Sequence, residues 1–341
     1  MANLFKEGKG SFLKKLRIIF IIFGISILGG LIYYTGPRII LNYLKIMGWY
    51  TPLILIPYAV LIIFDAKAWA YSFNPSLKNK KVGLGILYLV RMAGESVNNL
   101  TPTGYLGGEP VKALLLKRFG VTLTEGLTSV VVAKTTMIIA QIIFMSIGGM
   151  ILLSRVGCPI NIKICLLIAP LISGGGLALI VRWQKMGCFS SIIGFLKRPL
   201  AMFRILESVE ERLVKIDQSI SHFYISNKKG FTASIFFHFI GWVLGTAEVY
   251  LMLYLMDVKV SIADSLIIES MGQFIKGLGF FMPGSLGIYE GGGVIIFRIL
   301  GMEGGTGLTL IVIKRIREIV FNLIGLLLIL QLGGKRKRLK K

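Results

Sequence analysis

The chain has 341 residues, of which 55% are apolar and only 16% are charged. Soluble domains are usually about one quarter charged, so this composition excludes an ordinary soluble protein and indicates insertion into a membrane. The net charge of +23 does not indicate nucleic-acid binding, because Lys and Arg gather in four separate stretches, 6–17, 78–81, 182–229 and 335–341. The three cysteines and two histidines show no metal-ligand spacing, and we expect neither a metal nor a cofactor.

Six segments predict helices that cross the membrane, because each is apolar and long enough for about 30 Å of hydrocarbon. They are residues 17–35, 50–72, 123–153, 162–181, 231–256 and 306–332. The first follows a basic start and has no cleavage site, so we expect it to be retained and to run outward from the cytoplasm.

Two further regions predict helices that break inside the membrane and turn back. The first consists of residues 83–100 and 109–119, which are each too short to span and which enter from the cytoplasm. The second region, 262–300, enters from the opposite side. Proline cannot continue a helix, and glycine weakens one. The predicted break positions are Pro102, Gly104, Gly107, Gly108, Pro283, Gly284 and Gly287.

The basic stretches predict which side of the membrane each loop occupies. With both hairpins in place, successive crossings put all four basic stretches on the same side. The basic segment 182–230 predicts cytoplasmic or interfacial helices that contact anionic lipid head groups. We therefore expect a multi-pass protein of a bacterial-type inner (plasma) membrane, with both termini in the cytoplasm.

An internal repeat relates the two broken regions. A shift of 181 residues superimposes positions of the same chemistry: Pro102 and Pro283, Glu109 and Glu290, Gly126 and Gly307, Lys134 and Arg315, and Gln141 and Asn322. Because the hairpins enter from opposite sides, repeat one (about 83–153) and repeat two (about 262–332) have inverted topology within one polytopic domain, 1–341. Inverted repeats of broken helices typically form a substrate site at their interface.

Charged and amide side chains recur at helical spacing inside these segments. An unpaired charge at the bilayer centre costs about 2.5–3.5 kcal/mol, so such residues face one another or a wet cavity. The candidate substrate-binding residues are Lys134, Arg315, Glu95, Asn98, Asn99, Glu109, Gln141, Glu269, Gln273, Lys276, Glu290, Lys314, Glu318 and Asn322. We interpret Lys134 and Arg315 as symmetric cations of one anion-binding cavity, whereas Lys112, near a span end, is expected to reach the interface.

A structural role for these charges stays open at this point. They could form ion pairs that hold the helices together without contacting a substrate. Glu109 and Glu290 could simply cap the half-helices that they begin, because a carboxylate is favourable at a helix N-terminus.

Five stretches carry a resemblance to a known family: IIFDAKAWAYSF (62–73), GESVNNLTPTGYLGGEPVKALLLKRFGV (94–121), LGTAEVYLML (244–253), ESMGQFIKGLGFFMPGSLGIYEGG (269–292) and IKRIREIV (313–320). They resemble the flippase-like family of the lysylphosphatidylglycerol synthase transmembrane domain, and most closely its HpnL-like branch, which is associated with hopanoid lipids. The resemblance implies movement of a lipid or lipid-linked molecule across the membrane. We expect no acyltransferase domain after the last span, so a lysyltransferase activity is not implied.

The sequence therefore predicts an all-α integral membrane protein with six spanning helices and two broken re-entrant hairpins in inverted repeats. We expect a lipid flippase or transporter for an anionic or lipid-linked substrate, with lipid-synthesis enzymes as candidate partners. The chain has no GxxxxGK[ST] motif, so we expect no ATP hydrolysis, and we expect no enzyme activity. One alternative is a membrane-embedded lipid-modifying transferase, which is disfavoured because neither histidine is expected near the charged hairpins. The other is a non-transporting scaffold of a lipid-synthesis complex.

Overall fold

A computed structural model of the chain describes residues 33, 38, 41, 45, 48–74, 82–101, 103, 105–154, 160–197, 205–280, 283–285 and 287–333. Regular structure in this part of the chain is entirely helical, so the predicted all-α class is confirmed there. The first predicted span, 17–35, lies outside the described residues except for Tyr33. Pro102 and Gly104 of the first predicted break also lie outside them.

The helices agree with the predicted segments in order and nearly in length. The first group contains η1 (Gly48–Ile54), α3 (Leu55–Tyr71), α4 (Leu84–Leu100), α5 (Gly108–Leu116), η3 (Lys117–Phe119), α6 (Leu123–Leu153) and α7 (Ile160–Met186). The second group contains α8 (Cys188–Lys197), α9 (Ile205–Ser226), α10 (Lys228–Leu255), α11 (Ile262–Leu278), η4 (Pro283–Ser285), α12 (Ile288–Ile299) and α13 (Gly304–Gly333). The helix that contains the fourth predicted span, α7, extends beyond residue 181 to Met186, and it ends at Gly187, whose φ of 98° is incompatible with a helix.

Four helices of the described part are long and apolar enough to cross a membrane: Gly48–Tyr71, Leu123–Leu153, Lys163–Met186 and Lys228–Leu255. The predicted last span, α13, is as long as these helices but carries Lys314, Arg315, Arg317 and Glu318 in its middle. Those charges reduce its apolar character, and they are buried or paired inside the bundle as described below.

Both predicted hairpins are interrupted between their two helices. The backbone leaves α4 after Leu100, and α5 starts at Gly108, which follows Gly107. In the second hairpin, Gly284 and Gly287 have φ values of 59° and 78°, which glycine adopts readily and other residues rarely do. Each break thus falls where the sequence supplies proline or glycine, which end or weaken a helix.

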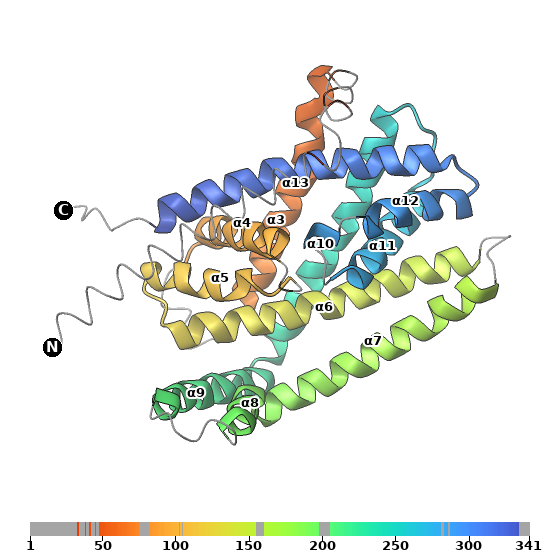
Figure 1. The fold of residues 1–341 in the computed structure, drawn as a ribbon. Helices are drawn as coiled ribbons and strands as arrows, with labels where there is room; N and C mark the ends of the chain where they lie inside the picture. The colour runs from red at the N-terminus through yellow and green to blue at the C-terminus, as the bar shows by residue number, and fades with distance from the viewer. Residues whose placement is uncertain are drawn as a thin grey trace.

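The two halves of the chain pack in matched pairs of helices. The 181-residue shift relates α3 to α10, α4 to α11, α5 to α12 and α6 to α13. In agreement with that relation, α3 packs along α10, while α4 packs on α13 and α11 packs on α6. Figure 1 shows α6 running from left to right and α13 running from right to left, so these two matched helices point in opposite directions.

The predicted amphipathic segment forms two helices beside the bundle, at the lower left of Figure 1. On α9, Ile216, Ile220 and Phe223 recur at helical spacing and pack against Val132 of α6. The carboxylate of Asp217, also on α9, accepts the backbone N–H groups of Phe189 at 3.1 Å and Ser190 at 2.7 Å at the start of α8. That contact satisfies N–H groups that a helix N-terminus leaves free and fixes α8 onto α9.

Candidate functional site

A cavity of about 300 Å³ lies at the centre of the bundle, between α3, α4, α6, α10, α11 and α13. Its charged lining comes from both halves of the chain: Asp65, Arg91, Glu95, Lys134, Glu248, Glu269, Lys276, Lys314, Arg317 and Glu318. Four amide side chains also line it: Asn99, Gln141, Gln273 and Asn322. Among the described residues the lining therefore holds as many acidic as basic side chains.

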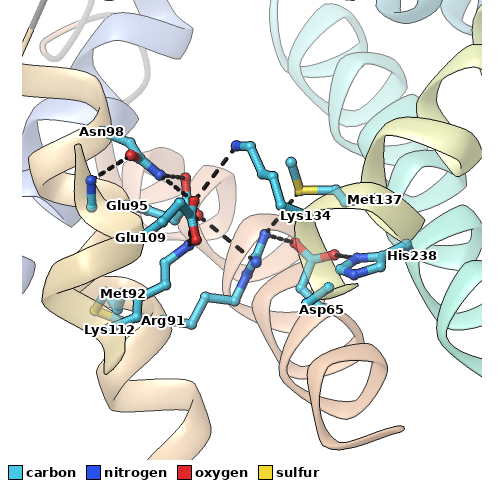
Figure 2. Close-up of polar contacts among 12 residues, drawn as sticks. Asp65, Arg91, Met92, Glu95, Asn98, Glu109, Lys112, Lys134, Met137 and His238 are labelled. Carbon is cyan, nitrogen blue, oxygen red and sulfur yellow. Dashed lines mark hydrogen bonds and ion pairs between the residues drawn. The ribbon is translucent and has the colours of Figure 1, made fainter. Parts of the chain in front are cut away.

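The first charge cluster lies where the broken hairpin α4–α5 meets α6 (Figure 2). The Nζ atom of Lys112 lies 2.7 Å from Glu95 and 3.1 Å from Glu109. Lys134 extends from α6 towards the same carboxylate, with its Nζ atom 3.7 Å from Glu109. Asn98 donates to Glu109 at 3.0 Å. Glu109 is thus shared between two lysines and an amide.

A second contact chain continues from this cluster towards α3 and α10. The guanidinium of Arg91 donates to Asp65 at 2.5 Å and lies 3.8 Å from Glu95. The other Asp65 oxygen lies 2.7 Å from Nδ1 of His238 (Figure 2). The expectation that neither histidine lies near the charged hairpins is therefore wrong for His238, because α10 packs along α3 and brings His238 to the carboxylate that holds Arg91 of α4.

The matching cluster of the second half lies on α11, α12 and α13. Lys276 pairs with Glu318 at 2.5 Å. Arg315 donates to Glu290 and to Glu318, each at 2.9 Å. Lys314 pairs with Glu269, which also accepts a 2.8 Å hydrogen bond from Gln273. Like the first cluster, this one leaves carboxylates shared between several donors, which compensates part of the cost of burying them.

The repeat predicted which residues correspond, and the structure shows that corresponding residues contact each other in both halves. Glu109, at the start of α5, pairs with Lys134 on α6, and Glu290, at the start of α12, pairs with Arg315 on α13. The two glutamates differ in a second contact. Glu290 caps its helix by accepting the N–H of Gly287 at 2.7 Å, whereas at the start of α5 the N–H groups of Gly107 and Gly108 are accepted by the side chains of Thr103 and Asn98.

The two halves also contact each other directly beside the cavity. Asn99 of α4 donates to Asn322 of α13 at 3.1 Å. The hydroxyl groups of Tyr105 and Ser285, one from each break, lie 2.8 Å apart. Both residues have a positive φ, 61° and 52° respectively, which is uncommon outside glycine and tends to occur at functional sites. The two interruptions therefore meet within the protein interior.

Ten of the predicted site residues line the cavity: Glu95, Asn99, Lys134, Gln141, Glu269, Gln273, Lys276, Lys314, Glu318 and Asn322. The other four residues lie outside the lining. They contact each other in two pairs, Asn98 with Glu109 and Glu290 with Arg315. The prediction that Arg315 faces the cavity together with Lys134 is wrong, because two carboxylates hold its guanidinium between α12 and α13.

Lys112 was also placed wrongly by the sequence. Instead of reaching the interface it is only 4% exposed, because α5 folds back onto α4. The close approach depends on Gly108, where a Cβ would lie 2.0 Å from the carbonyl oxygen of Gly94. Lys112 consequently meets Glu95, a residue that the sequence separates from it by a helix break.

Sequence reasoning missed five polar residues of the site: Asp65, Arg91, His238, Glu248 and Arg317. A signal existed for Arg91, which precedes Glu95 by one helical turn, the spacing used to select other members of the set. Arg317 likewise lies three residues after Lys314, whereas Glu248 has no member of the set at helical spacing; the two side chains form two hydrogen bonds of 2.5 and 2.6 Å between α13 and α10.

Comparison with known proteins places this architecture in a family. The chain matches the family model described as the lysylphosphatidylglycerol synthase TM region over residues 21–325. It is also similar to a UPF0104 membrane protein from Methanothermobacter thermautotrophicus, with 22% identity over 319 residues that cover 87% of this chain and 90% of that relative. No solved structure matches the chain. The resemblance predicted from the sequence is therefore confirmed at the level of the family, whereas the HpnL-like branch stays a prediction. The chain belongs to the lysylphosphatidylglycerol synthase transmembrane family.

Proposed function

We propose that this protein is a lipid flippase or lipid transporter, which moves an anionic or lipid-linked substrate across the membrane without ATP hydrolysis and without changing it chemically. The observation that carries the proposal is the charged cavity between helices of both halves. A polar head group crosses about 30 Å of hydrocarbon only at a high free-energy cost. A polar cavity inside a bundle of apolar helices provides the head group with hydrogen-bonding partners along that path.

The proposal includes the finer membrane arrangement of six spans and two re-entrant hairpins in inverted repeats. The opposite directions of α6 and α13 support inverted repeats (Figure 1). In the same view, α8 and α9 lie at the left end of the bundle and the α12–α13 connection lies at the right end. Arg182, Lys185, Lys228 and Lys229 belong to the α7–α10 region near α8 and α9, which supports a cytoplasmic side there and cytoplasmic termini in a bacterial-type inner membrane.

We assign the anionic group of the substrate to Lys134. Its ammonium lies 3.7 Å from Glu109, and its side chain is 16% exposed and lines the cavity. An arriving phosphate or carboxylate can replace Glu109 at Lys134, because Glu109 keeps its contacts with Lys112 and Asn98. This exchange leaves no buried charge unpaired, which keeps its cost low. By contrast, Arg317 is held firmly by both oxygens of Glu248.

Reconstituted vesicles carrying a fluorescent phosphatidylglycerol test the proposal, with the quenching of outer-leaflet fluorescence as the readout. The wild-type protein should equilibrate the lipid between leaflets. Lys134→Gln should slow this step about 10- to 100-fold, the effect of losing one hydrogen bond to a charged group. Arg315→Gln, the change at the matched position, should instead lower thermal stability, because it removes a partner of Glu290 and Glu318.

Other outcomes of the same experiment support the alternative functions. A new lipid species detected by mass spectrometry, formed with a nucleotide or aminoacyl donor, would indicate a transferase. Stable co-purification with a lipid-synthesis enzyme, without lipid movement in the vesicles, would indicate a scaffold. Unchanged lipid movement in Lys134→Gln would remove Lys134 from the substrate site.

A further inference from the structure

A second hollow of about 400 Å³ lies between α6, α7 and α11, beside the charged cavity. Four described residues line both spaces, namely Ile138, Gln141, Gln273 and Gly277, so the two spaces adjoin each other. We call this hollow the side groove. Its volume falls in the range of about 300–1,000 Å³ that is common for ligand pockets.

The side groove is apolar and faces outward from the bundle. Leu166, Leu177 and Phe274 contribute to its walls, and Gln141, Gln273 and Ser173 are the polar side chains in its lining. Two groove residues at its edge, Ile180 and Leu278, are 48% and 57% exposed. In a protein embedded in a membrane, such an edge opens to the acyl chains of the bilayer and not to water.

At the repeat-related position among the described residues, α4 and α13 are in direct contact. There Asn322, which the repeat matches to Gln141, accepts a hydrogen bond from Asn99 and joins α13 to α4. Gly325 allows the two helices to approach closely at the same contact, since a Cβ on it would lie 2.6 Å from the carbonyl oxygen of Met92. Gln141 has no hydrogen-bond partner among the described residues and faces both spaces. Gln141 thus lacks the contact that its counterpart Asn322 makes, and it lies where the side groove meets the charged cavity.

We propose that the side groove binds an acyl chain of the lipid whose head group occupies the charged cavity. This inference rests on the proposed function and names the substrate as a lipid that enters sideways, between α7 and α11. A lipid carries a polar head joined to apolar chains, and the structure offers a polar cavity next to an apolar groove. The four shared residues lie at the head–chain junction, where Gln141 and Gln273 offer amide groups to the ester or glycerol oxygens.

Two glycines of α7 provide a matched pair of variants. Gly176 lines the side groove, whereas Gly175 does not. A Cβ at either position meets no atom within 4 Å, so the first carbon of a new side chain is accommodated equally at both. Gly176→Trp therefore fills the groove, and Gly175→Trp adds the same bulk to the same helix outside it.

The experiment uses the full chain in nanodiscs with a phosphatidylglycerol that carries a diazirine at the end of one acyl chain. In the wild-type protein, cross-links should map to groove residues such as Ser173 and Phe274. Gly176→Trp should reduce their yield about tenfold or more, since several methylene groups lose their place in the groove. Gly175→Trp should leave the yield unchanged. A thermal unfolding curve shows that each variant is folded, and Gly277→Leu, at the junction of the two spaces, serves as a second blocking variant.

Three results would overturn the inference. Equal cross-linking in the two tryptophan variants would show that no chain occupies the groove. Cross-links confined to outward residues such as Leu171 and Leu179 would indicate ordinary lipid around α7. If another part of this chain or a second protein shields the groove residues from the lipid cross-linker, the occupant of the groove is that segment or protein and not an acyl chain. The readout is separate from transport, because a cross-link that responds to Gly176→Trp supports the groove even if the vesicles show no lipid movement.

Discussion

At the residue scale, the charges of the cavity differ in how firmly each is held. Arg317 binds Glu248 through two hydrogen bonds, and both side chains are buried. Lys134 has a longer ion pair and retains some exposure. Breaking a buried pair by removing one partner is strongly destabilising, whereas a partly exposed charge can change partners at little cost. The set therefore contains firmly held ion pairs and one more loosely held cation, which suits the role proposed for Lys134.

Glu248→Gln should destabilise the protein through Arg317. The change removes the negative charge from the closest partner and leaves Arg317 with Glu318 at 3.6 Å. Loss of one partner of a buried pair costs about 3–5 kcal/mol, so the midpoint of thermal unfolding in detergent should fall clearly. Glu303→Gln, at an exposed position, is the control and should leave the midpoint unchanged. Equal midpoints for the two variants would contradict a structural role for this pair.

Cys188 should resist thiol reagents in the folded protein at pH 8. Burial and the nearby carboxylate of Asp217 raise the pKa of its thiol to about 11, so only about one thiol in a thousand is the reactive thiolate at that pH. In a variant with Cys158→Ser and Cys165→Ser, the rate of maleimide labelling should rise about tenfold per pH unit above pH 8. Unfolding in detergent with urea should restore rapid labelling at pH 8. Prompt labelling of the folded variant at that pH would show that Asp217 and burial do not protect the thiol.

At the element scale, close contact between helices depends on small residues at matched positions of the repeat. Gly126 of α6 lies against Ala113 of α5, with an added Cβ 3.3 Å from that residue. Its counterpart Gly307 of α13 lies against α12, where an added Cβ would be 2.5 Å from the carbonyl oxygen of Gly293. In both halves this approach places the half-helix glutamate within reach of the cation on the next helix.

Gly307→Ala should therefore separate α13 from α12 and weaken the Glu290–Arg315 contact. The added methyl group meets a backbone atom, which cannot rotate away, so the protein must shift or unfold earlier; overpacking of this kind costs about 1–3 kcal/mol. Gly305→Ala on the same helix is the control. The Cβ added there lies 3.4 Å from its nearest neighbour, which belongs to the flexible side chain of Glu303. Thermal unfolding of both variants provides the measurement. A Gly307→Ala variant as stable as Gly305→Ala would contradict the tight packing described here.

At the scale of the whole molecule, the proposed inverted repeats would place the two ends of the bundle on opposite sides of the membrane. The α12–α13 connection lies at one end, and α8 and α9 lie at the other (Figure 1). Glu303 belongs to the first end, and Lys229 lies in the α9–α10 region; both are exposed. The proposed orientation places Lys229 in the cytoplasm and Glu303 outside.

Cysteine labelling in intact cells checks this orientation. In a variant without native cysteines, Glu303→Cys should react with a membrane-impermeant maleimide in intact cells. Lys229→Cys should react only after permeabilisation, because the basic residues around it favour the cytoplasm. Labelling of both positions from the same face would contradict the proposed inverted repeats. Labelling of each from the face opposite to the one expected would instead reverse the orientation and keep the repeat.

Much of the helical order could be predicted from the sequence. The length of the apolar run predicted α6 with the bounds that the structure shows, Leu123–Leu153. Glycine and proline predicted the interruptions between α4 and α5 and between α11 and α12. The repeat also identified Glu109 with Glu290, and Lys134 with Arg315, as corresponding positions. These features depend on local chemistry and periodicity, which a single chain displays without its fold.

The partners of the charges were decided by the tertiary structure alone. Arg317 meets Glu248, and His238 meets Asp65, across 69 and 173 residues of sequence, because α10 packs along α3 and lies beside α13. Helical spacing indicates which residues share a face but not which other helix that face meets. The same limit explains why Arg315 was expected in the cavity and is instead held by Glu290 and Glu318. The sequence determined the helices, their breaks and their repeat, whereas contact between distant helices determined which charges are paired and which face the cavity, since pairing depends on distances that only packing sets.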